Sequence, residues 1–237
     1  MTPETYVLLG TALTIGFIHT LFGPDHYLPF IVMSKARSWS MTKTAVVTIL
    51  CGIGHVASSI VLGFVGIALG VAVFHLENIE SVRGEVAAWL FLAFGLAYFI
   101  WGIRHVVRRR GHHHRHVHFD GEIHDHPHTH LKEHSHVHSG PKGVNLTPWI
   151  LFTIFVFGPC EPLIPILMYP AAKGNMFLVA AVSLVFGITT ITTMLAIVLA
   201  VSYGLAKLPM GRLERYSHAL AGLAIFLSGA AIKLFGL

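Results

Sequence analysis

Residues 5–33 read TYVLLGTALTIGFIHTLFGPDHYLPFIVM, an apolar run that is interrupted at Gly23-Pro24-Asp25-His26. A helix that crosses a bilayer needs about 20 mostly apolar residues, and this run exceeds that length. Proline has no N–H to donate to the carbonyl of Thr20, and its ring clashes with that carbonyl. We therefore predict a transmembrane helix that breaks at Gly23-Pro24.

The composition of the whole chain places it among membrane proteins. Of its 237 residues, 54% are hydrophobic and 11% are charged, whereas an average soluble domain carries roughly 25% charged residues. These proportions exclude a soluble globular enzyme, a disordered chain and a nucleic-acid-binding protein. We expect an all-α protein that lies in the lipid bilayer, with no enzymatic activity and no nucleic-acid partner.

Six stretches are long and apolar enough to cross a bilayer. They divide the chain into a first group of three spans in residues 1–108, a loop in residues 109–146, and a second group of three spans in residues 147–237. The six stretches are residues 5–33, 44–74, 86–107, 147–170, 176–206 and 218–235.

Lysine and arginine fall mainly on one side of the predicted bundle. Thirteen of the 16 follow the first, third or fifth span, whereas the connection after the second span is acidic, with Glu77, Glu80 and Glu85 around Arg83. Because cytoplasmic loops collect positive charge, we expect both termini outside and the 109–146 loop in the cytoplasm. No transit peptide precedes the first span, which favours a prokaryotic cytoplasmic membrane.

The two groups of spans are similar to each other. Residues 95–102 (GLAYFIWG) and 222–229 (GLAIFLSG) share five of eight positions, and Gly-Pro interrupts both the first and the fourth span. With three spans per copy the second copy is inverted, so we predict a 3+3 inverted repeat with broken helices 1 and 4. This arrangement is typical of transporters that bind their substrate near the bilayer midplane. The alternative is chance similarity between apolar segments.

Ionisable side chains inside a membrane are costly and are functional by default. His19 and His26 lie seven residues apart and so on one side of a helix, about 10 Å apart along a straight axis. The break between them lets His26 turn toward His19. Imidazoles with carboxylates suit divalent nickel, cobalt, zinc or iron. The predicted metal ligands are His19, Asp25, His26, His55 and Glu161, with Cys160 as a softer ligand.

A structural interpretation of these residues stays open. Asp25 and His26 could form an interhelical hydrogen-bonded pair that holds the kink, and a structural role applies equally to His55.

The loop between the third and fourth spans is rich in histidine. Residues 112–138 contain 12 of the 18 histidines, many at alternate positions, which puts imidazoles on one side of an extended chain. The segment has too few apolar residues to fold alone. We predict an accessory, low-specificity metal-binding loop; a solvated, pH-responsive loop is the alternative. Its histidines are His112, His113, His114, His116, His118, His124, His126, His128, His130, His134, His136 and His138.

The segment His19-Thr-Leu-Phe-Gly-Pro-Asp-His26, Gly54-His55 in the second span and Gly158-Pro159-Cys160 in the fourth resemble the nickel/cobalt transporter families, NicO and UreH-like, of the LysE-type transporter superfamily. In those families the first-helix motif and the second-helix histidine are associated with metal selection, and the resemblance carries this role to His19, Asp25, His26 and His55. The permease pattern has four residues between its first His and the Asp, whereas this chain has five. Uptake and efflux therefore both stay open.

The function expected from this resemblance is transport of a divalent transition-metal cation through a site between the two repeats. Nickel and cobalt are the first candidates, and zinc is a further one. No tightly bound cofactor is expected.

Two other functions stay open. A membrane metallochaperone or sensor for a nickel enzyme would need the histidine-rich loop but no conducting path, and a cytoplasmic metallochaperone could also be a partner. A relative in the same superfamily is the CcdA-like thiol electron carrier of cytochrome c biogenesis, which uses paired cysteines in its first and fourth helices. Cys160 stands at the matching place in the fourth span, but Asp25 stands where the first cysteine would be.

Overall fold

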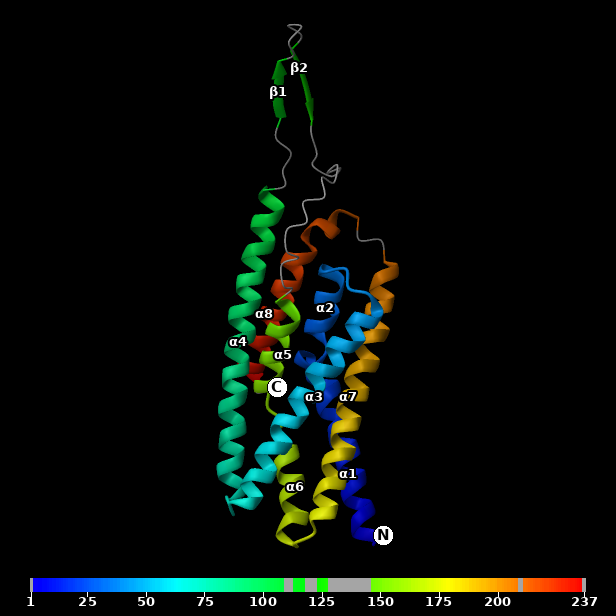
Figure 1. The fold of residues 1–237 in the computed structure, drawn as a ribbon, viewed down its shortest axis with the longest axis vertical. Helices are drawn as coiled ribbons and strands as arrows, with labels where there is room; N and C mark the ends of the chain where they lie inside the picture. The colour runs from blue at the N-terminus through cyan, green and yellow to red at the C-terminus, as the bar shows by residue number, and fades with distance from the viewer. Residues whose placement is uncertain (1, 109–112, 118–122, 128–145, 209–210, 236–237) are drawn as a thin grey trace.

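Long helices that run along one common direction build most of the computed structural model (Figure 1), which describes residues 2–108, 113–117, 123–127, 146–208 and 211–235. The elements in chain order are α1 (Pro3–Phe22), the 3-10 helix η1 (Pro24–His26), α2 (Leu28–Ala36), α3 (Met41–Ala68), α4 (Val73–Arg108), β1 (His113–Val117), β2 (Ile123–Pro127), α5 (Thr147–Phe157), α6 (Leu163–Ala172), α7 (Met176–Lys207), η2 (Gly211–Tyr216) and α8 (Ser217–Phe235).

Five helical segments of the described residues are long and apolar enough to cross a membrane: α1, α3, α4, α7 and the segment Leu213–Leu234 that contains most of α8. The chain is therefore an all-α membrane protein, as predicted. The predicted fourth span is instead two short apolar helices, α5 with 11 residues and α6 with 10. Neither alone reaches the length of about 20 residues that a single crossing needs, so the described residues contain five long apolar helices, which do not by themselves show the predicted count of six.

Both predicted helix breaks are present. Helix α1 ends at Phe22, and the N–H of Gly23 caps it by donating to the carbonyl of His19 at 3.0 Å. Helix α5 ends at Phe157, where the N–H of Gly158 donates to the carbonyls of Ile154 and Phe155. At each break the next residue is a proline, which has no N–H to continue the helical hydrogen bonds.

Helix α4 begins 13 residues earlier than the predicted third span. It starts at Val73 rather than at residue 86, so Glu77, Glu80 and Glu85 lie in the helix and not in an outer connection. The prediction was wrong for a physical reason. Glu80 is 0% exposed, and it can be buried in the helix because it pairs with Arg83 one turn later. A hydropathy scale scores each charged residue separately and takes no account of this contact.

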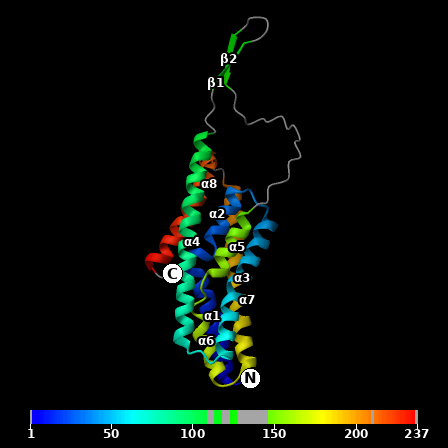
Figure 2. The ribbon, with the colours of Figure 1, turned by 60° about the vertical axis from the view of Figure 1, so that its left-hand side comes forward.

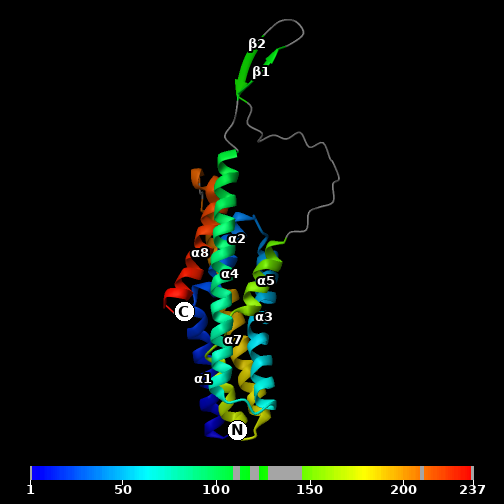
Figure 3. The ribbon, with the colours of Figure 1, turned by 90° about the vertical axis from the view of Figure 1, so that its left-hand side faces the viewer.

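The two similar motifs, GLAYFIWG in α4 and GLAIFLSG in α8, pack against each other. A Cβ atom on Gly95 would lie 2.3 Å from the backbone nitrogen of Phe226, and a Cβ on Gly222 would lie 2.3 Å from that of Phe99. The contact is thus reciprocal, and it needs glycine because the two backbones touch. Figures 2 and 3 show α4 and α8 side by side from two directions.

Two clusters of buried side chains fill the bundle. The first joins α2 and α5 with their neighbours through residues such as Phe30, Met33 and Phe155. The second joins α1, α6 and α7 through residues such as Leu163 and Phe186. In Figure 1, α2 and α5 occupy the upper half of the helical bundle, and α1 and α6 occupy the lower half. The two helix breaks therefore lie between the two apolar clusters.

Part of the histidine-rich segment forms a two-stranded antiparallel sheet. β1 pairs with β2 so that His114 lies opposite His126 and His116 lies opposite His124. The extended conformation was predicted, but the pairing was not. His113 lies opposite Pro127. The remaining seven histidines of this segment lie outside the described residues: His112, His118, His128, His130, His134, His136 and His138.

Candidate functional site

Three histidines meet at the break in the first helix. His19 lies in the last turn of α1, His26 in η1 and His55 in α3. The ring centroids of His19 and His26 are 4.7 Å apart, and those of His26 and His55 are 5.0 Å apart. One ligand atom from each residue lies within 4.8 Å of the others. The break therefore brings His26 toward His19, as its Gly-Pro sequence predicted.

This histidine triad has the properties of a metal site. His26 and His55 are each 3% exposed, and the Nε2 atoms of His19 and His26 are buried without a hydrogen-bond partner. A buried nitrogen left in this way costs free energy, and an imidazole nitrogen is a common ligand of transition metals. The triad could therefore hold a metal ion, although the geometry does not select one ion.

Asp25 sets the orientation of the His26 ring. Nδ1 of His26 lies 3.3 Å from Oδ1 of Asp25 and 3.2 Å from the carbonyl oxygen of Gly23. Because both oxygens accept hydrogen bonds, we assign the ring proton to Nδ1, which leaves the lone pair on Nε2. The hydrogen-bonded pair expected at the kink is thus present, but within one break rather than between two helices.

Cys160 lies beside the triad, at the second helix break. Its Sγ atom is 3.3 Å from Nε2 of His55, and the residue is 0% exposed. Nδ1 of His55 lies 3.3 Å from the carbonyl oxygen of Phe155. A carbonyl only accepts, so Nδ1 carries the proton and Nε2 presents a lone pair to the thiol. Cys51, one turn before His55 in α3, is a free and buried thiol like Cys160.

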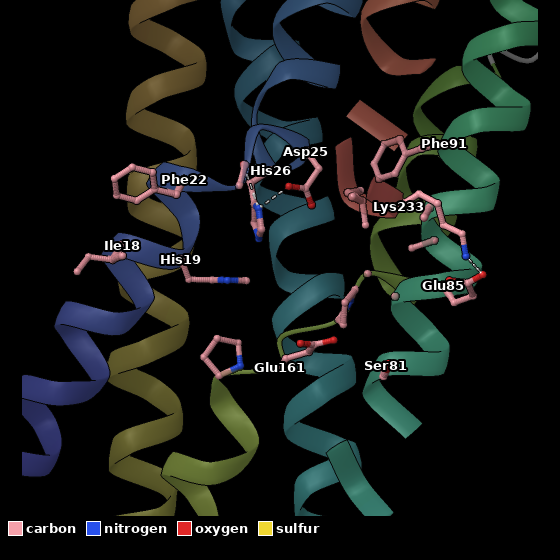
Figure 4. Close-up of a pocket in the computed structure, with 18 residues that line it drawn as sticks. Ile18, His19, Phe22, Asp25, His26, Ser81, Glu85, Phe91, Glu161 and Lys233 are labelled. Atoms are coloured by element: carbon pink, nitrogen blue, oxygen red, sulfur yellow. Dashed lines mark hydrogen bonds and ion pairs between the residues drawn. The ribbon is translucent and has the colours of Figure 1, made fainter. Parts of the chain in front are cut away.

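A cavity of about 440 Å³ opens beside the triad, between α1, α4, α8 and the α5–α6 break. His19, Asp25 and His26 line it from the first break, and Glu161 lines it from the second (Figure 4). An ion pair between Glu85 and Lys233 also borders this space. Glu161 is exposed there and does not belong to the triad, so it faces the predicted site from across the cavity.

Two residues that were not predicted as site residues contact the second break. Glu80 accepts a hydrogen bond from the backbone N–H of Cys160 at 3.0 Å. Arg83 donates to the carbonyl oxygen of Val156 at 2.8 Å. The signal that could have found them is the spacing of opposite charges three residues apart in an otherwise apolar stretch, since such a pair lies on one face of a helix.

Residues 28–231 match the family described as the transmembrane region of cytochrome C biogenesis proteins. No curated protein and no solved structure matches the chain. The family match overturns the assignment to the nickel/cobalt transporter families, and with it the predicted transport of a divalent transition-metal cation. It begins two residues after His26, so none of it depends on the His19–His26 motif that carried the wrong assignment. It favours the thiol electron carrier, which was an alternative.

Proposed function

Because the chain belongs to the family of the cytochrome C biogenesis transmembrane region, we propose that it transfers electrons across the membrane by thiol–disulfide exchange, with Cys160 as the reacting thiol. The observation that carries this proposal is the 3.3 Å contact between Sγ of Cys160 and Nε2 of His55. It places a thiol beside a hydrogen-bond acceptor at a helix break in the middle of the bundle.

The surroundings of Cys160 suit thiol exchange. The thiolate, not the thiol, is the nucleophile, and the lone pair on Nε2 of His55 points at the thiol proton. Cys160 is itself buried, but its neighbours Pro159 and Glu161 both line the cavity. A shift of the chain at this break therefore exposes the sulfur to a small reactant in the cavity.

The proposed reaction consists of two balanced exchanges. The thiolate of Cys160 first attacks a disulfide on one side of the membrane, so that a mixed disulfide with Cys160 forms, the original S–S bond breaks and one sulfur leaves as a thiolate that takes up a proton. A thiolate from the other side then attacks the partner sulfur of this mixed disulfide, so that a new disulfide forms between these two sulfurs, the bond to Cys160 breaks and the Cys160 thiolate is released. One electron pair passes from the second thiol to the first disulfide. The thiol from the other side of the membrane thus takes the place of a second cysteine, which a carrier with paired cysteines in its first and fourth helices would supply itself.

We also propose six crossings in an inverted 3+3 repeat, in which α1 with α2 and α5 with α6 form the two broken crossings. The reciprocal packing of Gly95 on Phe226 and of Gly222 on Phe99 supports this proposal, since a twofold relation between the halves produces such pairs. The distribution of lysine and arginine supports termini outside and the histidine-rich segment in the cytoplasm of a prokaryotic cell.

For the histidine triad we propose a resident divalent transition metal. Imidazoles suit nickel, cobalt and zinc, and such an ion would be held by the Nε2 atoms of His19 and His26, which lack partners, while Nε2 of His55 stays with the Cys160 thiol. It would hold the first break in its bent form.

The function is tested with the purified protein in proteoliposomes. The vesicles enclose an aromatic disulfide that absorbs light once reduced and that does not cross the bilayer, and glutathione is added outside. The wild-type protein should reduce the enclosed disulfide, and Cys160→Ser should abolish this reduction. Cys51→Ser is the matched control because it removes the other buried thiol, and it should retain the activity. Equal activity of Cys160→Ser and the wild type would refute the proposal.

A further inference from the structure

A charged pair inside α4 contacts both ends of the α5–α6 break. Glu80 is 0% exposed, the Arg83 side chain is 16% exposed, and the guanidinium is paired with Oε1 of Glu80. Charged side chains at this depth are rare and functional by default. The exchange reaction proposed above does not use either residue, so their role has to come from what they contact.

Arg83 binds the C-terminal end of α5. One of its terminal nitrogens donates to the carbonyl oxygens of Val156 at 2.8 Å and of Gly158 at 3.3 Å. The last carbonyls of a helix have no partner within the helix, and they carry the negative end of the helix dipole. A guanidinium therefore supplies both the missing donors and the opposite charge.

Glu80 binds the chain as it leaves the break. Its Oε2 atom accepts from the backbone N–H of Cys160 at 3.0 Å and from the hydroxyl of Ser59 at 3.1 Å. The hydroxyl oxygen of Ser59 in turn accepts from Arg83 at 3.2 Å. The carboxylate thus holds the backbone of the reacting cysteine directly, and a side chain of α3 ties it to the same network.

The same network reaches the helix that carries His55. Arg83 donates to the hydroxyl of Ser58 at 2.5 Å, and this hydroxyl donates to the carbonyl oxygen of His55 at 2.7 Å. Cys160 and its imidazole partner are therefore fixed to one charged pair from two sides. None of the side-chain atoms in this network is among the buried polar atoms that lack a partner in the described structure.

We propose that Glu80 and Arg83 are positioning residues that hold the α5–α6 break and thereby keep the Cys160 thiol against His55. A buried ion pair by itself adds little to stability, because desolvation of the two charges offsets their attraction. The contribution of this pair is geometric, since it joins three segments that meet at the sulfur. The inference deepens the proposed function, on which it rests for the role of the thiol.

The test measures the position of the thiol without any redox partner. In a Cys51→Ala background Cys160 is the single thiol, and the S–H stretching band in the infrared spectrum reports whether its proton is hydrogen-bonded. We expect Glu80→Gln and Arg83→Gln to move this band toward that of a free thiol. We also expect both to lower the rate of alkylation by iodoacetamide about tenfold, since the thiolate is the nucleophile and the thiol proton loses its acceptor, a change of about one hydrogen bond.

Two further variants sharpen the result. Arg83→Lys keeps the positive charge but lacks the planar fork that reaches five acceptors, so it should behave like Arg83→Gln. Glu77→Gln removes the same charge from the exposed face of α4 one turn earlier, and it should leave the band and the alkylation rate unchanged.

Variants of a buried pair can fail to fold, and Ser59→Ala covers this case because it deletes a single hydroxyl of the network. It should shift the band in the same direction by a smaller amount. An unchanged band in folded Glu80→Gln and Arg83→Gln, or in Ser59→Ala if those two do not fold, would overturn the inference. A shifted band together with no electron transfer by the wild type would refute the proposed function alone.

Discussion

The contact between α4 and α8 predicts that a glycine-to-alanine substitution there lowers the free energy of unfolding, whereas the same substitution elsewhere in a helix raises it. In a membrane helix, glycine to alanine normally stabilises, by up to about 1 kcal/mol from helix propensity. At Gly95 the added Cβ would lie 2.3 Å from the nitrogen and 2.6 Å from the Cα of Phe226. Carbon atoms in ordinary contact are about 3.5–4.0 Å apart, so the two backbones must separate by roughly 1 Å.

This separation of the two helices determines how much the free energy of unfolding falls. Overpacking costs about 1–3 kcal/mol in general, and the value here falls in the upper part of that range because the atoms in the way are backbone atoms and cannot rotate aside. After the gain in propensity is subtracted, Gly95→Ala should lower the free energy of unfolding by about 1–2 kcal/mol. Gly222→Ala should have the same effect, since its Cβ would lie 2.3 Å from the nitrogen of Phe99.

The assay is reversible unfolding in mixed micelles with increasing detergent denaturant, followed by circular dichroism. Gly10→Ala in α1 and Gly204→Ala in α7 are the controls, because a Cβ at either position meets nothing within 4 Å. Both controls should be neutral or stabilising. The double variant of Gly95 and Gly222 should lose less than the sum of the single losses, since one separation of the helices accommodates both methyl groups. The reasoning would be refuted if Gly95→Ala were as stable as Gly10→Ala.

Two further predictions concern the site itself. A variant without residues 112–138 lacks the histidine-rich segment, and in isothermal titration calorimetry it should bind about one divalent transition-metal ion. In this background His26→Ala should abolish the binding, because the triad loses its central ring. Undiminished binding by His26→Ala would contradict a site in the triad. Gly158→Ala would place a Cβ 2.8 Å from Nδ1 of His55, so it should slow disulfide reduction in proteoliposomes. The control Gly204→Ala should not slow it. Equal rates in the two variants would show that the His55 ring does not need its present position.

The sequence predicts the features that depend on backbone chemistry. Gly-Pro marks both helix breaks because proline lacks an N–H, and the seven-residue spacing of His19 and His26 becomes a contact once the first break bends. Similarity between residues 95–102 and 222–229 predicted a repeat but not a contact, and the structure brings these two segments together. In the first two cases a local rule applies without knowledge of the neighbouring helices.

Features that depend on packing were not predicted. Glu80 and Arg83 look like residues of an outer connection, since their partners at Ser59, Val156 and Cys160 come from other parts of the chain. The 3.3 Å contact between Cys160 and His55 likewise joins residues that had been considered separately. The family assignment failed because it depended on a short histidine motif, whereas the match to the cytochrome C biogenesis family spans residues 28–231 and excludes that motif.

The charged pair in α4 has a consequence for membrane insertion. During synthesis α4 emerges before α5 and α6, so Glu80 and Arg83 must enter the bilayer before the break that they bind exists. A single charge in an inserting helix costs up to about 2.5–3.5 kcal/mol, the value at the helix centre. Because the two residues lie three positions apart on one helix, they enter as a neutral pair. They are then in place when the polar backbone of the α5–α6 break follows, and that backbone is never left facing lipid.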